Sequence, residues 1–220
     1  MMKISTDDMS LLNRWHFDVR LTSNTDFRQI AQQFENDVEC LFEKLKDSGN
    51  HADSSAYTIL NLMRLSLELR LKDNVIHFAK YSSVVKLPNL FTHDLRILFA
   101  NLKKCIKSTV ENIKEKYDIE VTIDDLKETD ELLLKTKEII ELFDRIDKDS
   151  CSLRYPVDKK FNRFFIDPVK LNLLDVRESF NEALTFLRLV SHVFSQYTDY
   201  VDYVEEMNAR MYADEMESYW

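Results

Sequence analysis

The near absence of glycine limits what this chain can fold into. The 220 residues include one glycine and three prolines, far below the usual few per cent of each. Tight hairpins between β-strands need residues that adopt a positive φ, most often glycine or asparagine. Helices joined by a small number of loops need far fewer such residues. The chain is therefore expected to be all-α.

The bulk composition supports one large domain. Hydrophobic residues make up 45% of the chain, which is too high a fraction for a disordered protein. No apolar run approaches the length of about 18 residues that indicates a membrane-spanning helix, and the first residues lack the apolar region of a signal peptide. Three widely spaced cysteines suggest reduced thiols. We expect a cytoplasmic location, no membrane association, and no metal or cofactor.

The negative charge is concentrated at the C-terminus. Residues 197–220 hold seven acids and one base, Arg210, which gives −6 of the net charge of −9. The other 196 residues therefore carry only −3. Broad binding to duplex DNA needs many lysines and arginines, so this charge distribution disfavours it. A local basic patch is still compatible with the distribution.

Apolar residues recur at helical spacing in five segments. A first helix is expected over residues 27–45, with Thr25 as N-cap and Gly49 as a left-handed C-cap. The next segment, residues 55–81, contains alternating leucines in "LSLELRLKD", a strand-like pattern. We predict a helix there because the flanks have helical spacing and the Leu, Glu, Arg and Lys residues of this stretch are good helix formers, none of them β-branched.

Three more helices follow. One is expected from the N-cap Thr92 through residue 117, one from near Thr129 to residue 146, and one from near Asp175. No helix-breaking residue follows Asp175. A helix continuous to about Glu217 would span about 60 Å, so part of it would project beyond a small bundle.

Four segments, in order, resemble the HEPN-like helical domains of uncharacterised bacterial proteins. They are "FRQIAQQFENDVECLFEKL", "YTILNLMRLSLELRLKDNVIHF", "FTHDLRILF" and "SCSLRYPVDKK", within residues 27–187. The resemblance implies an antiparallel bundle of four to five long helices, here with an extended C-terminal helix, and often a dimer. We divide the chain into an N-terminal extension (1–24), the HEPN-like bundle (25–196) and an acidic, aromatic-rich tail (197–220).

The same resemblance implies a class of activity. Active members of the group are metal-independent RNases with an R-x(4–6)-H motif, and they act as toxins or defence effectors. Other members lack that motif and bind nucleotides or partners. Arg70 and His77 have the motif spacing, on the "LELRLK" helix. In such a site the histidine would move a ribose proton and the arginine would stabilise phosphate charge. The alternative is a surface arginine and a partly buried histidine.

Two further polar groups have both structural and chemical interpretations. Glu68 lies among leucines, and a buried carboxylate needs a partner. Arg154 is a candidate for a bidentate pair, unless Glu68 faces solvent. His93 and Asp94 resemble the HD pair of all-α metal phosphohydrolases. His77 and either Asp144 or Asp147 would be the further ligands there. The HD pair is equally explained as the start of a helix.

The loop "SLRYPVDKKFNRFF" combines bases with aromatics. Arg154, Tyr155, Lys159, Lys160 and Arg163 form a candidate binding set, because such residues suit phosphate contact and base stacking. RNA or a nucleotide is the ligand class expected. The alternative is a connector whose aromatics pack into the core.

The C-terminal tail has tyrosine and methionine at helical spacing, which is typical of an interface. The tail could pair with a copy of itself or with another protein, or cover the basic loop of a neighbouring subunit. Three functions therefore stand: a HEPN-like effector with RNase activity, a non-catalytic helical binding and oligomerisation module, and an HD-type phosphohydrolase.

Overall fold

The computed structural model describes residues 19, 21, 23–48, 51–83 and 89–217. Most of the predicted N-terminal extension and the predicted cap at Gly49 lie outside these residues. The described part contains six α-helices and a short 3₁₀ turn, and it contains no β-sheet. The helices are α1 (Phe27–Ser48), α2 (Ala56–Tyr81), α3 (Leu95–Tyr117), α4 (Ile123–Asp147), α5 (Leu173–Val193) and α6 (Ser195–Glu217), and the 3₁₀ turn is η2 (Ala52–Ser54). The prediction of an all-α bundle is confirmed.

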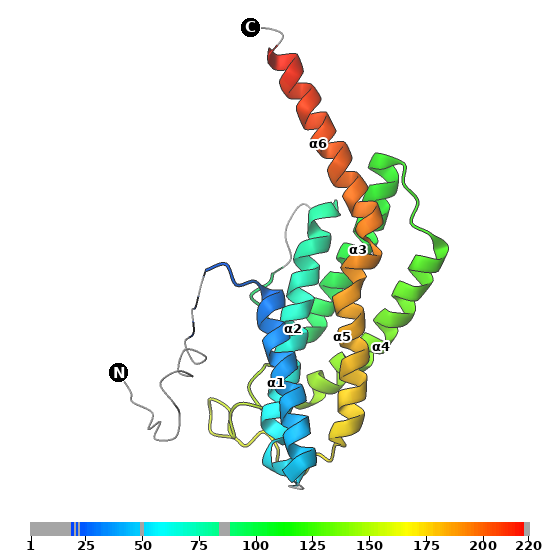
Figure 1. Cartoon of the computed structure of the whole chain (residues 1–220). Helices are drawn as coiled ribbons and strands as arrows, with labels where there is room; N and C mark the ends of the chain where they lie inside the picture. The colour runs from blue at the N-terminus through cyan, green and yellow to red at the C-terminus, as the bar shows by residue number, and fades with distance from the viewer. Residues whose placement is uncertain (1–18, 20, 22, 49–50, 84–88, 218–220) are drawn as a thin grey trace.

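Helix α2 is the centre of the bundle. It packs against α1, α3 and α5, while α4 lies against α3 and α5 (Figure 1). The consecutive residues Ser66, Leu67 and Glu68 are all buried, so different sides of α2 are covered at once. This arrangement explains the strand-like alternation in the sequence. A helix that is covered on several sides has apolar residues off the usual single stripe.

The N-caps of α1 and α3 differ from the predicted ones. Asp26, not Thr25, forms a capping box with Gln29: its carboxylate accepts the Gln29 amide at 2.7 Å, and its own amide donates to the Gln29 side chain at 3.3 Å. At α3, Asp94 replaces the predicted Thr92 as N-cap and accepts two backbone amides at 2.9 and 3.1 Å. In both places the aspartate side chain, and not the nearby threonine, accepts the free amides of the first turn. Its negative charge also interacts favourably with the positive end of the helix dipole.

Helix α4 begins earlier than predicted. Its N-cap is Thr122, whose hydroxyl accepts the amide of Asp125 at 3.2 Å. Thr129, the predicted start, lies inside the helix and donates its hydroxyl to the carbonyl of Asp125 at 2.6 Å. A threonine can satisfy its hydroxyl in this way within a helix, so its presence alone did not mark a terminus.

The C-terminal helix bends once. Helix α5 ends at Val193, Phe194 interrupts the helix, and α6 starts at Ser195. The Ser195 hydroxyl donates to the carbonyl of His192 at 2.8 Å, and the Thr198 hydroxyl donates to the carbonyl of Phe194, four residues earlier, at 3.2 Å, a type of contact that often bends helices. Beyond the bend, Tyr197, Thr198 and Val201 are buried. The rest of α6 extends past the end of the bundle (Figure 1).

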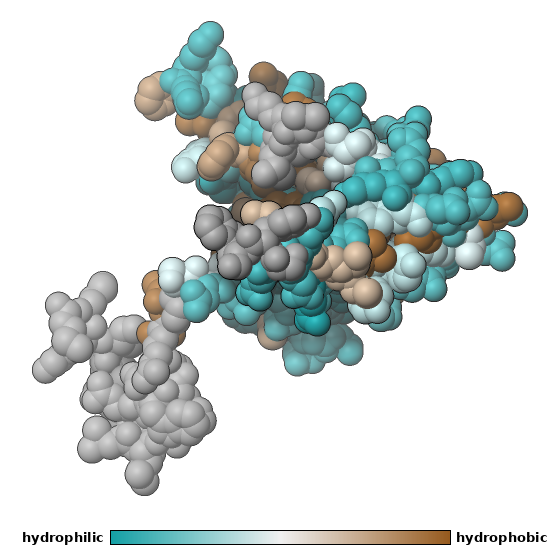
Figure 2. All heavy atoms as spheres, turned by 90° about the horizontal axis from the view of Figure 1, so that it is seen from above, coloured by the Kyte–Doolittle hydropathy of each residue, from teal (hydrophilic) through white to brown (hydrophobic). Residues whose placement is uncertain are grey.

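Polar side chains cover most of the surface that is visible from above, and hydrophobic ones are scattered among them (Figure 2). In the described part of the chain, no helix is both long and apolar enough to cross a membrane.

Candidate functional site

A buried cluster of charges connects α2 to α3 and α4. Arg64 is fully buried, and its guanidinium lies 3.0 Å from Glu68 and 3.2 Å from the carboxylate of Asp147. It also donates to the backbone carbonyls of Asp147 and His93, at 3.0 and 2.5 Å. One side chain thus fixes the last residue of α4 and the segment before α3 to the middle of α2.

Glu68 is the acid of this cluster. Lys72, one turn further along α2, lies 2.7 Å from Oε1 of Glu68, and Nδ1 of the exposed His93 lies 2.9 Å from the same oxygen. Burial by itself raises the pKa of Glu68, but hydrogen bonds from Lys72 and His93 outweigh it and lower the pKa below its ordinary value. The predicted partner was wrong: Arg154 instead donates to the carbonyl of Ser150.

A second buried cluster lies on another side of α2 and joins α1 to α5. Glu35 of α1 accepts hydrogen bonds from Arg70 at 2.8 and 3.0 Å, from Ser66 at 2.9 Å, and from Arg188 of α5. Burial raises the pKa of Glu35, whereas the contacts with Arg70 and Arg188 lower it more strongly. The carboxylate therefore stays ionised, as a buried ion pair requires.

The two predicted catalytic residues have separate environments. The Arg70 side chain is 4% exposed, and its donors contact Glu35 and Gln32. His77 is half-buried against the rings of Phe78 and Tyr81, with ring centroids 5.1 and 5.5 Å away. Its Nε2 is buried and has no hydrogen-bond partner among the described residues. Burial lowers the pKa of His77 and favours the neutral ring.

The basic loop between α4 and α5 has features of both a binding loop and a connector that packs on the core. Arg154 lies over the ring of Tyr155, 5.6 Å from its centroid, and both side chains are exposed. Lys159, Lys160 and Arg163 are exposed as well. Further along the loop, Phe165 is half-buried and makes an edge contact with Tyr57 at 6.1 Å. Some aromatics of the loop therefore pack against the bundle, while its bases face solvent.

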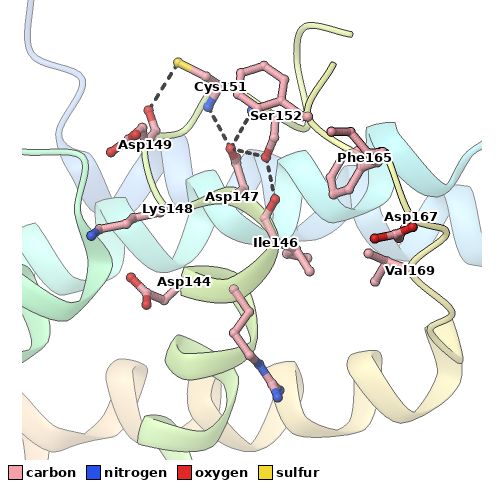
Figure 3. A pocket seen from close by; sticks show the side chains of 13 residues that line it. Asp144, Ile146, Asp147, Lys148, Asp149, Cys151, Ser152, Phe165, Asp167 and Val169 are labelled. Atoms are coloured by element: carbon pink, nitrogen blue, oxygen red, sulfur yellow. Dashed lines mark hydrogen bonds between the residues drawn. The ribbon is translucent and has the colours of Figure 1, made fainter. Parts of the chain in front are cut away.

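A cavity of about 490 Å³ separates the end of α4 from the returning part of this loop (Figure 3). Asp147 lies in its wall, and Oδ1 accepts the amides of Cys151 and Ser152, both at 2.7 Å, and the Ser152 hydroxyl at 2.8 Å. The same carboxylate contacts Arg64 through Oδ2. Asp147 thus acts as a structural anchor for the start of the loop.

A second, more apolar cavity of about 660 Å³ lies between the start of α2 and the same loop. Its wall includes Tyr57, Leu60, Leu153 and Phe165, with Lys170 also lining it. The residues that line both cavities belong mainly to elements that hold the loop against the bundle. These contacts determine the position of the exposed bases of the loop.

The predicted metal-ligand set does not come together. His93 contacts Glu68, Asp94 caps α3, Asp144 pairs with Arg96 at 3.0 Å, and Asp147 holds the loop. Across the described ranges, no three His, Cys, Asp or Glu side chains are grouped as metal ligands would be. The HD pair is therefore explained by its role at the start of α3.

The distal part of α6 carries exposed apolar side chains at the positions that the sequence indicated. Tyr203, Met207, Met211, Tyr212 and Met216 are all exposed. Nearer the bend, α6 is held by the bundle: Asp202 pairs with Lys80 at 2.8 Å, and Glu205 pairs with Lys116 at 2.9 Å. The predicted tail thus consists of a docked half and a projecting half.

Sequence reasoning missed several members of the buried clusters, namely Arg64, Glu35 and Arg188. A signal for Arg64 was present, because residues 64, 68 and 72 are four apart and so lie on one side of a helix. Glu35 and Arg188 had no comparable signal, since they reach Arg70's cluster from other helices.

Comparison with known proteins gave no further assignment. No protein-family model, no curated protein and no solved structure matches the chain.

Proposed function

We propose that the chain is a non-catalytic helical module that associates with a protein through the projecting half of α6. The observation that carries the proposal is the row of exposed tyrosines and methionines on residues 203–216, beyond the last buried residue of α6, Val201. Tyrosine and methionine are enriched at protein interfaces. Helical apolar stripes are a common means of protein recognition.

The spacing of this stripe is that of a helix that packs on another element. Within this row, Tyr203, Met207 and Met211 follow one another at steps of four residues, and Tyr212 and Met216 are also four residues apart. Side chains at such steps lie on one side of a helix. A terminal helix without a packing partner gains little from such a pattern, because most helical stability in proteins comes from burying an apolar face.

The placement of Arg70 favours this module over an RNase. An RNase arginine must approach the phosphate whose charge it stabilises, whereas Arg70 is buried against a carboxylate. His77 is held separately by aromatic rings. Both residues of the R-x(4–6)-H spacing thus have structural contacts. Within the HEPN-like group, the chain is then more similar to the members that lack catalysis and bind partners.

Truncation after Glu206 tests the proposal. This variant keeps the Lys80–Asp202 and Lys116–Glu205 pairs and removes residues 207–220. Light scattering coupled to size exclusion is expected to give an oligomer for the full chain and a monomer for the truncated one. A control variant with Leu134→Gln and Leu189→Gln removes exposed leucines from α4 and α5 and should keep the full-length mass.

A second measurement addresses catalysis directly. The purified full chain should leave a mixed-sequence RNA intact in the presence of EDTA, and its expression should not arrest growth. RNA cleavage that His77→Ala abolishes would contradict the non-catalytic assignment. An oligomer of the full chain whose mass is unchanged after truncation would remove α6 as the interface.

A further inference from the structure

The turn at residues 157–163 of the basic loop is a small, well-ordered hairpin. Val157 and Arg163 form an isolated antiparallel bridge, and the Asp158 amide donates to the carbonyl of Asn162 at 2.9 Å. The Asp158 carboxylate accepts the backbone amides of Lys160 and Asn162, at 2.7 and 2.9 Å, and the side-chain amide of Asn162 at 3.0 Å. We call residues 157–163 the basic hairpin.

Phe161, at the tip of the basic hairpin, has a costly position. Its φ is 63°, a left-handed conformation that glycine adopts without strain but a bulky side chain does not. Its side chain is 86% exposed, so the phenyl ring gains little from burial. Backbone strain of this kind persists where the surroundings enforce it and is often found at functional positions. Phe161 is thus held out towards solvent by a fixed turn.

The basic hairpin and the projecting half of α6 are complementary in charge and in apolar character. Residues 158–163 carry a net +2, and residues 206–217 carry a net −3. The hairpin presents one exposed ring, and the helix presents exposed Met207, Met211 and Tyr212. Methionine sulfur makes favourable contacts with aromatic rings, and opposite charges around such a contact fix its orientation.

The two surfaces lie at opposite ends of the molecule, so they do not meet within one chain. The loop that carries the hairpin lies beside the start of α2, whereas α6 projects from the other end of the bundle (Figure 1). We infer that the partner of α6 is a second copy of this chain, and that the projecting half of α6 docks on its basic hairpin. This inference rests on the proposed function and names the partner surface.

Two other arrangements agree less well with the charges. Pairing α6 with the α6 of another copy would bring together two segments of −3, and like charges across an interface are unfavourable. Nucleic acid on the basic hairpin would fit its lysines and its ring. The net charge of −9 opposes the approach of a polyanion and of a second copy alike, but only the α6 of a second copy also brings the exposed side chains of Met207 and Met211 to the ring of Phe161.

Mixing two variants tests the inference. One is the truncation after Glu206, which keeps the hairpin. The other is Lys159→Glu with Lys160→Glu, which keeps α6. Each variant alone is expected to be a monomer, because it lacks one of the two surfaces. An equimolar mixture is expected to form a heterodimer through the one remaining contact, with a Kd at least tenfold weaker than that of the wild type.

Three comparisons make the result decisive. The same charge reversal at Lys103 and Lys104, which are exposed on α3, should leave the wild-type mass unchanged. Phe161→Gly should also weaken association at least tenfold, without any change of charge. Added salt should weaken the wild-type oligomer, because charge contributes to the contact.

The outcomes separate the inference from the proposed function. If truncation dissociates the oligomer but the hairpin variant keeps it, α6 has another partner surface and only the inference fails. If both variants are monomers and the mixture stays monomeric, the inference is also overturned. If the full chain is an oligomer and truncation leaves its mass unchanged, both fail. If the full chain is a monomer, the inference fails. One further result would assign the hairpin to nucleic acid instead. In that case a labelled single-stranded RNA binds the wild type but does not bind a hairpin variant that still forms the oligomer.

Discussion

Replacing Glu35 by glutamine tests whether its cluster holds α1, α2 and α5 together. The Glu35 side chain is 3% exposed, and its removal as a charge leaves the guanidinium of Arg70 buried without a counter-ion. Breaking a buried ion pair at one partner costs about 3–5 kcal/mol. Arg188 is partly exposed and can turn to water, so we expect the lower end, about 3 kcal/mol. Since domains are stable by about 5–15 kcal/mol, urea unfolding at neutral pH will resolve this loss.

The chain supplies a control on the same helix, α1. Glu39, one turn along α1, pairs with Arg177 of α5, and these side chains are 44% and 29% exposed. Glu39→Gln should cost only about 0–1 kcal/mol, as exposed pairs do. The double variant Glu35→Leu with Arg70→Leu should recover most of the loss, because it removes both charges. A Glu35→Gln loss no larger than that of Glu39→Gln would refute the reasoning.

Four further outcomes are expected. The pKa of Glu35 is lowered from its ordinary 4.5. The contribution of its ionised form to folding stability is therefore present above about that pH and is lost as the pH falls. In urea titrations, Glu35→Gln should lose less stability than the wild type below pH 4.5. The pKa of His77 is lowered from 6.5, so stability falls below that pH, and His77→Phe should reduce this loss. Asp94→Ala removes the α3 cap and should cost about 1 kcal/mol in thermal unfolding. Phe161→Gly relieves the left-handed strain and should not destabilise the monomer by more than about 0.5 kcal/mol, even as association weakens.

The position of the helices was predictable because it depends on local pattern. The segment around Leu67 is a case where two patterns compete: alternating leucines favour a strand, while leucine, glutamate, arginine and lysine favour a helix. The absence of glycine and proline within residues 55–81 favours the helix. The observed burial on several sides of α2 explains why the competing pattern existed.

The helix ends were less predictable because neighbouring residues can perform the same capping chemistry. At α1 the predicted cap is Thr25 and the observed one is Asp26, and at α3 the predicted cap is Thr92 and the observed one is Asp94. In both cases the carboxylate is the cap. A sequence contains both acceptors, but only the backbone geometry selects the one that reaches the free amides.

The candidate site was harder to predict, because its partners come from distant parts of the chain. Arg70 has the spacing of a catalytic motif with His77, but its direction is set by Glu35, thirty-five residues earlier. Spacing along one helix gives the side of the helix on which a residue lies. It gives neither the neighbouring helix on that side nor the charge that this helix presents.

Two acids of the docked half of α6 pair with bases of the bundle, and these pairs govern how association can be measured. The Asp202 carboxylate raises the pKa of Lys80, and the hydrogen bonds from Tyr117 and Lys116 lower the pKa of Glu205, so both pairs are ionised. These contacts are exposed, and salt weakens exposed pairs. Salt therefore acts on the docking of α6 to its own bundle as well as on contacts between copies. Truncation after Glu206 keeps the first set of contacts and removes only the projecting half, so it separates the two effects where salt alone does not.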